Sequence, residues 1–390
     1  MTTYSVAVVA ACPFPQPRGT PIRIFRMAES LAARGHRVEV ITYHLGQKLG
    51  DVSFPISRIP NIPTYGRLRP GPSYQKLLLV DPVLAIKILS VLRRRRFDLI
   101  HAHHYEGLLA SLPAARLLGL PVVFDVHTLL RSELPHYSLG LPRTTLHWIG
   151  QILDRWLPPL ADHIVAVTDA IRGRLIGEMG MNPEKITTVY TAAELEHFTP
   201  SDGIGADAAA RTLIYTGTLE SYQRIDLMLR ALRRVVDQRP DVRLKIVSDS
   251  SLEPYADLIQ QLQLSPHLEL LPDHYFQLPQ NLHTALIALS PRVVCDGLPA
   301  KILNYMATGR AIVAFAGSAE ILEHERTGLV IPNDDVEAFA AAILRLLADP
   351  QRARELGRNA RLQVEEFFVW EAAVQRLEQI YETVLRRRTG

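Results

Sequence analysis

The sequence predicts an α/β protein of two parallel-sheet domains, and three observations lead to this fold class. A chain of 390 residues is longer than one hydrophobic core usually organises. Short β-branched runs alternate with longer amphipathic segments, the pattern of a parallel sheet covered by helices. The alternation is interrupted at Thr199–Ala210, a small, polar, glycine-containing segment typical of a linker. We therefore expect two Rossmann-like domains that face a cleft.

Apolar, β-branched runs mark the strands of the first domain. The predicted strands are Val6–Ala10, Val38–Thr42, Leu99–Ala102, Val122–Asp125, Ile164–Ala166 and Ile186–Val189. The helices predicted between them are Ile22–Arg34, Pro82–Arg95, Tyr105–Leu117, Leu146–Leu157 and Ala170–Gly177. Asp81 before Pro82 is a typical helix start, because aspartate caps a helix and proline suits its first position.

The alternation restarts after the linker and builds the second domain. Its predicted strands are Leu213–Tyr215, Leu244–Val247, Ile287–Leu289, Ile312–Phe315 and Gly328–Val330, and three helical segments follow at Val336–Leu347, Gln351–Val364 and Val369–Arg387. We expect domains at residues 1–200 and 201–368, and a C-terminal helix at 369–390 that packs back toward the first domain. Ligands of open parallel sheets bind at the carboxyl ends of strands, which places the candidate site in the cleft.

Composition favours a soluble protein of the cytoplasm. Hydrophobic residues make up 47% of the chain, yet no apolar run approaches the roughly 20 residues that span a bilayer. No basic region precedes the first apolar stretch, which favours a first strand over a signal peptide. Cys12 and Cys295 are far apart in sequence and predict no disulfide framework; we expect one beside the cleft in each domain.

Positive charge is concentrated locally. The net charge of +3 is too small to predict a nucleic-acid partner. Arg93–Arg96 and Arg386–Arg388 are arginine runs, and the first follows a largely apolar helix. Cations suit the negative end of a helix, so a solvated helix terminus explains Arg93–Arg96. The alternative is peripheral contact with an anionic membrane at the inner face.

Two segments of the first domain carry candidate ligand groups. A glycine turn at Gly19 feeds a helix, where backbone N–H groups can bind an anion, although a proline-stiffened connector is equally consistent. His127 follows the strand at Val122, at the cleft edge. The spacing of His101, His103 and His104 permits a metal site, but we expect no matching carboxylate or cysteine set nearby, which favours a strand end that enters a loop.

The strongest signal lies between Ser290 and Gly309. An apolar strand ends at Ser290, a glycine loop follows, and Pro299 opens a helix that Gly309 closes. Lys301 in the first turn opposes the helix dipole, at a cost of a few tenths to about 1 kcal/mol. An anion such as a pyrophosphate would remove that conflict. By contrast, the glycine pattern at Gly203–Ala208 resembles a dinucleotide fingerprint but lacks a preceding strand.

These segments resemble the family-4 type of retaining glycosyltransferases with the GT-B fold, over nearly the whole chain. The similar segments are Phe14–Thr20, Leu31–Val38, Phe97–His103, Ala161–Thr168, Tyr215–Leu219, Gly297–Gly309, Ala311–Phe315 and Glu320–Pro332. Each motif is loose, but their order and spacing are specific. The resemblance implies transfer of a sugar from a nucleotide-sugar donor to a glycan or lipid-linked acceptor, in cell-surface polysaccharide or glycolipid synthesis.

The resemblance also implies roles for individual residues. The turn at Arg18, Gly19 and Thr20 would approach the donor phosphates and the transferred sugar, and His127 would hydrogen-bond that sugar. The family's paired acids fall on Asp296, which would contact the sugar, and on Asn304, which would hold the ribose.

The donor diphosphate would bind in the second domain. The implied donor-binding residues there are Gly217, Thr218, Gly297, Leu298, Pro299 and Glu320. The family's usual arginine and lysine, which follow Gly217, fall on Thr218 and Gln223. A leaving diphosphate needs a cation or dipole, and the available substitutes are Lys301, Arg224 and Arg292.

The implied mechanism needs neither metal nor cofactor. The sequence has no Asp-x-Asp pair, and in a front-face displacement the leaving phosphate oxygen takes the acceptor proton. His127, Lys301 and Asp296 are the expected catalytic residues. The substituted cations leave open a binding protein of the same fold that transfers nothing. A dinucleotide-dependent oxidoreductase is disfavoured, because no fingerprint follows the first strand.

Overall fold

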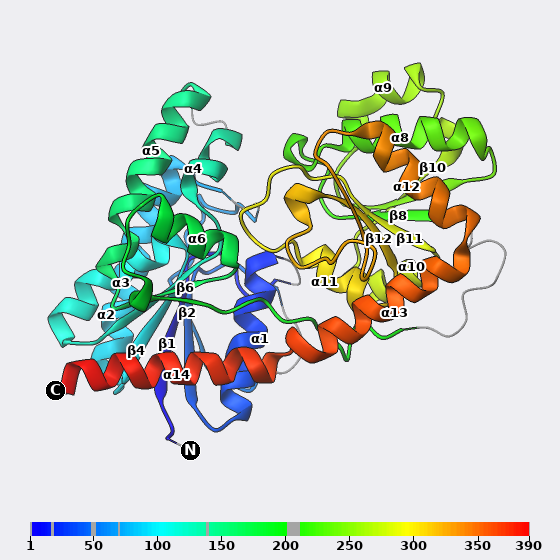
Figure 1. The fold of residues 1–390 in the computed structure, drawn as a ribbon. Coiled ribbons are helices and arrows are strands. Elements are labelled where there is room, and N and C mark those ends of the chain that lie inside the picture. The colour runs from blue at the N-terminus through cyan, green and yellow to red at the C-terminus, as the bar shows by residue number, and fades with distance from the viewer. Residues whose placement is uncertain are drawn as a thin grey trace. The chain divides into compact units, whose positions relative to one another are not determined.

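The chain forms two compact units in the computed structural model, which describes residues 2–16, 19–47, 52–68, 71–137, 140–200 and 211–389. Unit 1 comprises Met1–Thr191 and Trp370–Gly390, and unit 2 comprises Ala192–Val369. Each unit is a parallel sheet flanked by helices (Figure 1). The predicted α/β class with two Rossmann-like sheets is therefore confirmed.

The sheet of unit 1 has seven parallel strands in the order β3-β2-β1-β4-β5-β6-β7. The strands are β1 (Ser5–Ala10), β2 (Arg37–Thr42), β3 (Ile56–Arg58), β4 (Leu99–His103), β5 (Val122–Val126), β6 (His163–Ala166) and β7 (Ile186–Thr188). Chain order reverses between β1 and β4, where Val8 pairs with His101. The connections that follow two such strands run to opposite faces of the sheet and leave a crevice between them. The carboxyl ends of β1 and β4 therefore flank a position at which ligands commonly bind in open parallel sheets.

Helices of unit 1 come from both ends of the chain. They are α1 (Gly19–Ala33), α2 (Asp81–Arg94), α3 (His104–Leu118), α4 (Leu130–Glu133), α5 (Arg143–Trp156), α6 (Asp169–Gly177) and α14 (Trp370–Thr389). The last helix buries Val374, Leu377 and Tyr381 in the same core cluster as β1. The Tyr381 hydroxyl also lies 2.7 Å from His101 Nδ1, so α14 is an integral part of this unit.

The expected cap at Asp81 is wrong. A π-helical turn at Lys76–Val80 runs directly into α2, and Asp81 itself has helical backbone angles. Its carboxylate accepts a hydrogen bond from the Tyr43 hydroxyl at 2.5 Å, so it does not cap the backbone. Burial raises the Asp81 pKa to about 6. Pro82 lies in the first turn of α2, as expected.

The sheet of unit 2 has six parallel strands in the order β10-β9-β8-β11-β12-β13. The strands are β8 (Thr212–Thr216), β9 (Arg243–Val247), β10 (Leu268–Leu271), β11 (Ile287–Ser290), β12 (Ala311–Phe315) and β13 (Leu329–Ile331). The helices are α8 (Ile225–Gln238), α9 (Ala256–Gln261), α10 (Leu278–His283), α11 (Ala300–Ala307), α12 (Val336–Ala348) and α13 (Pro350–Phe367). Here the strand order reverses between β8 and β11, so the segments that follow these two strands are the expected place for a ligand.

None of the helices in the described part of the chain is both long and apolar enough to span a membrane.

Helix α5 packs with its small and polar residues inward. Its buried positions are Leu146, Gly150 and Asp154, spaced four residues apart. The Asp154 carboxylate accepts hydrogen bonds from the backbone N–H groups of Leu130 at 2.8 Å and Arg131 at 2.9 Å. A Cβ at Gly150 would lie 2.4 Å from the Arg131 backbone nitrogen, so only glycine lets the two helices approach this closely.

We predict that Gly150→Ala lowers the free energy of unfolding by about 1–3 kcal/mol, because α4 must move away. The matched control is Gly173→Ala in α6, where an added Cβ meets no atom within 4 Å. That variant should be neutral or stabilised by about 0.5–1 kcal/mol, since alanine is the better helix former. Chemical denaturation measures both. Equal stability of the two variants would contradict the close packing of α5 on α4.

Candidate functional site

The candidate site in unit 2 lies at the carboxyl ends of β8 and β11. Gly217 follows β8 with a φ of +113°, a conformation that side chains other than glycine rarely adopt. A Cβ built there would lie 3.2 Å from Lys301 Nζ. The turn after β8 and the start of α11 are therefore in contact, and Lys301 connects them.

Lys301 is a largely buried cation without an acidic partner at hydrogen-bond distance among the described residues. Its Nζ donates to Gln223 Oε1 at 3.2 Å and lies 4.0 Å from the centre of the Tyr215 ring. Burial, and secondly the positive charge of Arg292, lower the Lys301 pKa to about 7. A bound anion would reverse this shift, because it favours the charged ammonium.

Arg292 and Arg224 differ in how far their charges are compensated. The Arg292 guanidinium carbon lies 4.9 Å above the Tyr222 ring, and its Nε donates to the Val294 carbonyl at 2.6 Å. Arg224 instead forms ion pairs with Asp226 at 3.2 Å and Asp334 at 2.6 Å. Of the two, Arg292 is the cation whose field reaches Lys301.

The loop after β11 leads into α11 as a well-defined helix start. Asp296 is buried, at 2% exposure, and Cys295 Sγ donates to the Gly297 carbonyl at 2.8 Å. Pro299 is the residue before the helix, one position earlier than expected, and α11 begins at Ala300. The first N–H groups of a helix have no intrahelical acceptor, so this start can bind an anion.

The other predicted residues of unit 2 lie in the loops after β8, β11 and β12 and in α11. Gly297, Leu298 and Asn304 are partly exposed, and Asn304 lies one turn into α11. Thr218 continues the Gly217 turn, where its carbonyl accepts a hydrogen bond from the Tyr215 hydroxyl at 2.7 Å. Glu320 is exposed and follows the 3-10 turn Ala316–Ser318 after β12.

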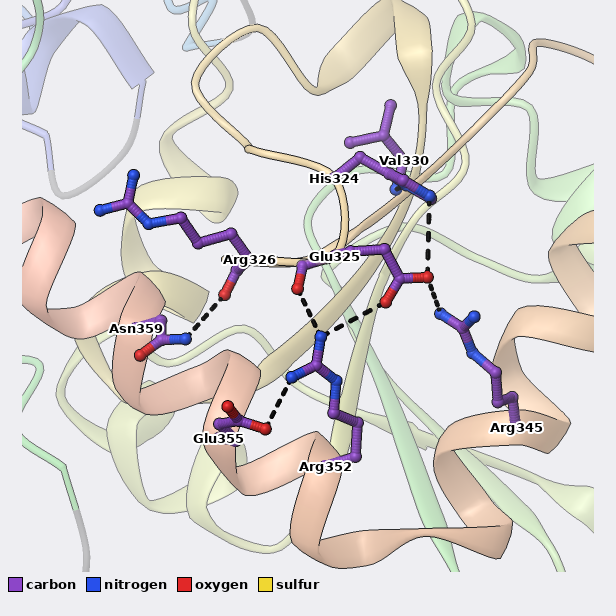
Figure 2. A network of polar contacts seen from close by, with 8 residues as sticks. All are labelled: His324, Glu325, Arg326, Val330, Arg345, Arg352, Glu355 and Asn359. Atoms are coloured by element: carbon purple, nitrogen blue, oxygen red, sulfur yellow. Dashed lines mark hydrogen bonds and ion pairs between the residues drawn. The ribbon is translucent and has the colours of Figure 1, made fainter.

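A charged network holds the segment between Glu320 and β13 on two helices. Glu325 pairs with Arg345 of α12 at 2.6 Å and with Arg352 of α13 at 3.4 Å (Figure 2). Arg352 also donates to the Glu325 carbonyl at 2.5 Å, and Asn359 Nδ2 donates to the Arg326 carbonyl at 3.1 Å. This loop is therefore fixed by several charge-assisted contacts in addition to the buried Ile321 and Leu322.

The candidate residues of unit 1 lie after β1, β4 and β5. Gly19 begins α1 with a φ of +54°, and Thr20 follows it. Arg18 lies outside the described residues. His127 Nε2 lies 3.1 Å from His103 Nδ1, and its ring is 4.9 Å from that of His104. Burial, and secondly the charge of His104, hold the His127 pKa well below its usual range, so its imidazole is neutral.

The expectation that His101 and His103 have no carboxylate nearby is wrong. Asp125 on the neighbouring strand brings Oδ2 to 3.8 Å from His101 Nε2 and 3.5 Å from His103 Nδ1. These three side chains have ligand atoms close enough for a metal ion. However, the Arg23 guanidinium lies 3.1 Å from the same Oδ2, and its charge disfavours a cation there.

Sequence reasoning did not find the Arg23–Asp125 pair. Arg23 is 4% exposed and also donates to the Val189 carbonyl and the Thr191 hydroxyl, both at 3.0 Å. Asp125 is fully buried, and burial raises its pKa although Arg23 opposes the shift. A charged residue inside an otherwise apolar strand was the available signal, because such a charge requires a partner.

The two cysteines differ in exposure. Cys12 is buried after β1, and burial raises its pKa to about 12. Cys295 is partly exposed beside Asp296, and burial raises its pKa as well. Both are free thiols, consistent with the absence of a predicted disulfide framework.

Comparison with known proteins gives one consistent result. Residues 17–197 match the sequence profile of Glycosyltransferase Family 4, and residues 210–349 match that of Glycosyl transferases group 1. A D-inositol 3-phosphate glycosyltransferase of Kineococcus radiotolerans is 26% identical, over 95% of this chain and 92% of its own length.

Solved structures share the fold over the whole chain. Sucrose-phosphate synthase from Thermosynechococcus elongatus superposes with a TM-score of 0.82 at 19% identity, over 98% of this chain and 100% of its own. HepE of Anabaena, solved in complex with UDP, superposes with a TM-score of 0.77 at 17% identity, over 97% and 100%.

The chain is a glycosyltransferase of the GT-B fold, because it has two parallel sheets, each with a reversal in strand order, and matches two glycosyltransferase profiles. Within this class, residues 17–197 match the family-4 type and residues 210–349 match the group 1 type, in agreement with the resemblance of the sequence motifs.

We predict that Asp125→Asn lowers the free energy of unfolding by about 3–5 kcal/mol, because it leaves the buried Arg23 charge without a counterion. The double variant Arg23→Met/Asp125→Asn removes both charges and should recover much of the loss. Denaturant unfolding of the single and double variants measures the coupling. A double variant less stable than Asp125→Asn would argue against charge compensation as the role of Arg23.

Proposed function

We propose that the chain transfers a sugar from a nucleoside-diphosphate sugar to an acceptor hydroxyl, with retention at the anomeric carbon and without a metal ion. The observation that carries the proposal is the position of the Lys301 ammonium, which lies against the Gly217 turn at the start of α11. The positive charge of Arg292 acts on the same ammonium. Burial and the nearby like charge disfavour the protonated form of Lys301, and a bound diphosphate would favour it.

The named relatives support this donor class. HepE was solved with UDP and with UDP-glucose, and the Kineococcus relative is named as a glycosyltransferase acting on D-inositol 3-phosphate. We extend the nucleotide-sugar donor to this chain and infer a glycan or lipid-linked acceptor in cell-surface polysaccharide or glycolipid synthesis. A cytoplasmic setting follows from such a donor.

In the proposed reaction the anomeric carbon loses its bond to the diphosphate oxygen and gains one to the acceptor oxygen. The departing phosphate oxygen accepts the acceptor's proton on the same face, so no separate base is required. Lys301 and the backbone N–H groups of Gly297 and Leu298 stabilise the leaving diphosphate. Proline has no N–H, so the Pro299 position contributes its backbone geometry and the exposed start of α11.

The remaining site residues position the donor. We propose that Asp296 and the neutral His127 imidazole hydrogen-bond hydroxyls of the transferred sugar, and that Asn304 holds the ribose without a charge. Arg292 adds positive potential beside Lys301, whereas the ion pairs of Arg224 with Asp226 and Asp334 suit it to holding the loop after β8. Gly19, Thr20, Gly217, Thr218 and Glu320 complete the proposed donor surroundings.

We predict that Lys301→Ala lowers turnover by about 10²-fold or more, because it removes the cation that stabilises the leaving diphosphate. The matched control is Lys245→Ala, a second lysine of unit 2 that bonds Thr284 at 3.1 Å. It should retain turnover within about threefold, since it lies outside the proposed site. Steady-state kinetics of both variants measure the difference, and near-normal turnover of Lys301→Ala would count against the role.

A panel of nucleotide-sugar donors, with and without acceptor extracts, tests the function itself. Release of nucleoside diphosphate with formation of a glycosylated product supports transfer, and NMR of the product reports the anomeric configuration. An inverted product would overturn retention. Donor binding by calorimetry without any release would instead identify a binding protein of the same fold.

The lowered Lys301 pKa predicts how nucleotide affinity depends on pH. Without a bound nucleotide, the Lys301 side chain has a pKa of about 7. A bound diphosphate raises this pKa, so above pH 7 nucleotide binding is coupled to the uptake of a proton. The affinity for UDP should fall by up to roughly tenfold per pH unit between pH 7 and 9, where the charge of UDP is constant. Lys301→Arg keeps its charge and should bind with little dependence on pH. Calorimetric titrations that show the same pH profile for both proteins would exclude Lys301 as the titrating group.

A further inference from the structure

Two neutral imidazoles share one hydrogen bond at the carboxyl ends of β4 and β5. His103 is fully buried, whereas 7% of the His127 side chain is exposed. His103 Nδ1 lies 3.1 Å from His127 Nε2. Burial holds the pKa of both side chains well below the usual range, so each ring carries a single proton. One ring must therefore donate this hydrogen bond and the other must accept it.

The Asp125 carboxylate favours the proton on His103. Its Oδ2 lies 3.5 Å from His103 Nδ1, whereas its Oδ1 lies 4.0 Å from His127 Nε2. The attraction between a negative oxygen and an N–H group grows as the distance falls, so the nearer nitrogen is the better place for the proton. Arg23 pairs with the same Oδ2 at 3.1 Å and keeps the carboxylate in this position.

The second nitrogen of His103 leads to the same assignment. His103 Nε2 is buried and has no hydrogen-bond partner among the described residues. If His127 were the donor, the only proton of His103 would be on Nε2, as a buried N–H group without an acceptor. Such orphaned N–H groups are rarer in proteins than unused acceptors. If His103 donates from Nδ1 instead, its Nε2 is only an unused acceptor.

His101, one position further into β4, directs its proton to the same carboxylate. The Tyr381 hydroxyl lies 2.7 Å from His101 Nδ1. When Tyr381 donates this bond, the His101 proton is on Nε2, which lies 3.8 Å from Asp125 Oδ2. The reverse direction would leave the buried Tyr381 hydroxyl hydrogen without an acceptor in the described part of the chain. Asp125 is thus the common acceptor of this cluster.

We propose that His103, held by Asp125, is a positioning residue that fixes His127 in the tautomer with its proton on Nδ1. His127 then presents a hydrogen-bond donor to an acceptor oxygen of the transferred sugar. No described residue accepts a hydrogen bond from His127 Nδ1, so this N–H group is available to a ligand. The proposal rests on the sugar-binding role of His127 proposed above, and it adds the direction of the bond and the residue that sets it.

This tautomer also limits what His127 can do chemically. Its Nε2 lone pair accepts the His103 proton, and its Nδ1 is already protonated. His127 therefore has no basic nitrogen left to take the proton of the acceptor hydroxyl. The arrangement agrees with a transfer in which the leaving phosphate oxygen takes that proton.

Nitrogen-15 NMR of histidine-labelled protein tests the tautomer directly, because protonated and bare ring nitrogens have distinct chemical shifts. The His127→Gln variant assigns the His127 signals among the 14 histidines. We expect a protonated Nδ1 and a bare Nε2 in the wild-type chain without any ligand. His103→Leu should draw the two signals toward each other, since His127 then exchanges between its tautomers. His103→Asn, whose amide can donate from nearly the same position, should preserve the wild-type pattern.

A double-mutant cycle tests whether His103 acts through His127. We expect His103→Leu to lower kcat/KM by about five- to tenfold, and His103→Asn to recover most of this loss. In a His127→Ala background, His103→Leu should cause no further loss, because the group that it positions is absent. The matched control is His163→Leu, which removes another buried strand histidine of unit 1 that contacts Thr187 at 2.9 Å. It should leave kcat/KM and the His127 signals unchanged, and circular dichroism verifies that each variant folds.

Three results would overturn the proposal. The first is a wild-type His127 that carries its proton on Nε2. The second is a set of His127 signals that His103→Leu does not move. The third is an equal loss of kcat/KM from His103→Leu with and without His127, which is the result of a purely structural role. If no donor is transferred, the proposed function fails, but the NMR spectra still decide the role of His103.

Discussion

Parallel pairing of every strand is the constraint on which the architecture depends. Because all strands of a sheet point the same way, each strand delivers the residues that follow it to one edge. In unit 2 this brings Gly217 after β8 together with Lys301, which follows β11 by a loop and the first residue of α11. In unit 1 it brings His103 and His127 together across adjacent strands. The chemistry of each unit is thus set by strand order rather than by closeness in sequence.

The sequence predicted the inner strands well because burial on both faces gives them a continuous apolar run. It missed β3 and β10, which lie at the edges of their sheets and are only partly buried. The edge strands β7 and β13 were predicted, because they contain buried apolar residues such as Ile186 and Leu329. Asp81 was misinterpreted for a related reason, since its partner Tyr43 is remote in sequence and local capping rules cannot anticipate it.

The candidate site was likewise predicted only in part from the sequence. Helix starts and glycine turns are local, and the sequence located those at Gly19 and Pro299, whereas Gly217 was implied only by the family resemblance. The electrostatic partners are not local. Nothing in the sequence near Lys301 indicates that it rests on the Tyr215 ring, and nothing near Asp125 indicates that Arg23 neutralises it. Charge compensation is a property of the folded packing, so it can be read only from the structure.

The position of α14 has a consequence for the order in which the protein forms during synthesis. Val374, Leu377 and Tyr381 complete the core under β1, although they emerge from the ribosome after the whole of unit 2. Unit 2 is continuous in sequence and can close its core while the C-terminal helix is still being made. The sheet of unit 1 must then wait, with one apolar layer uncovered, until α14 has been synthesised. A nascent chain stalled before residue 370 would expose that layer to chaperones and proteases.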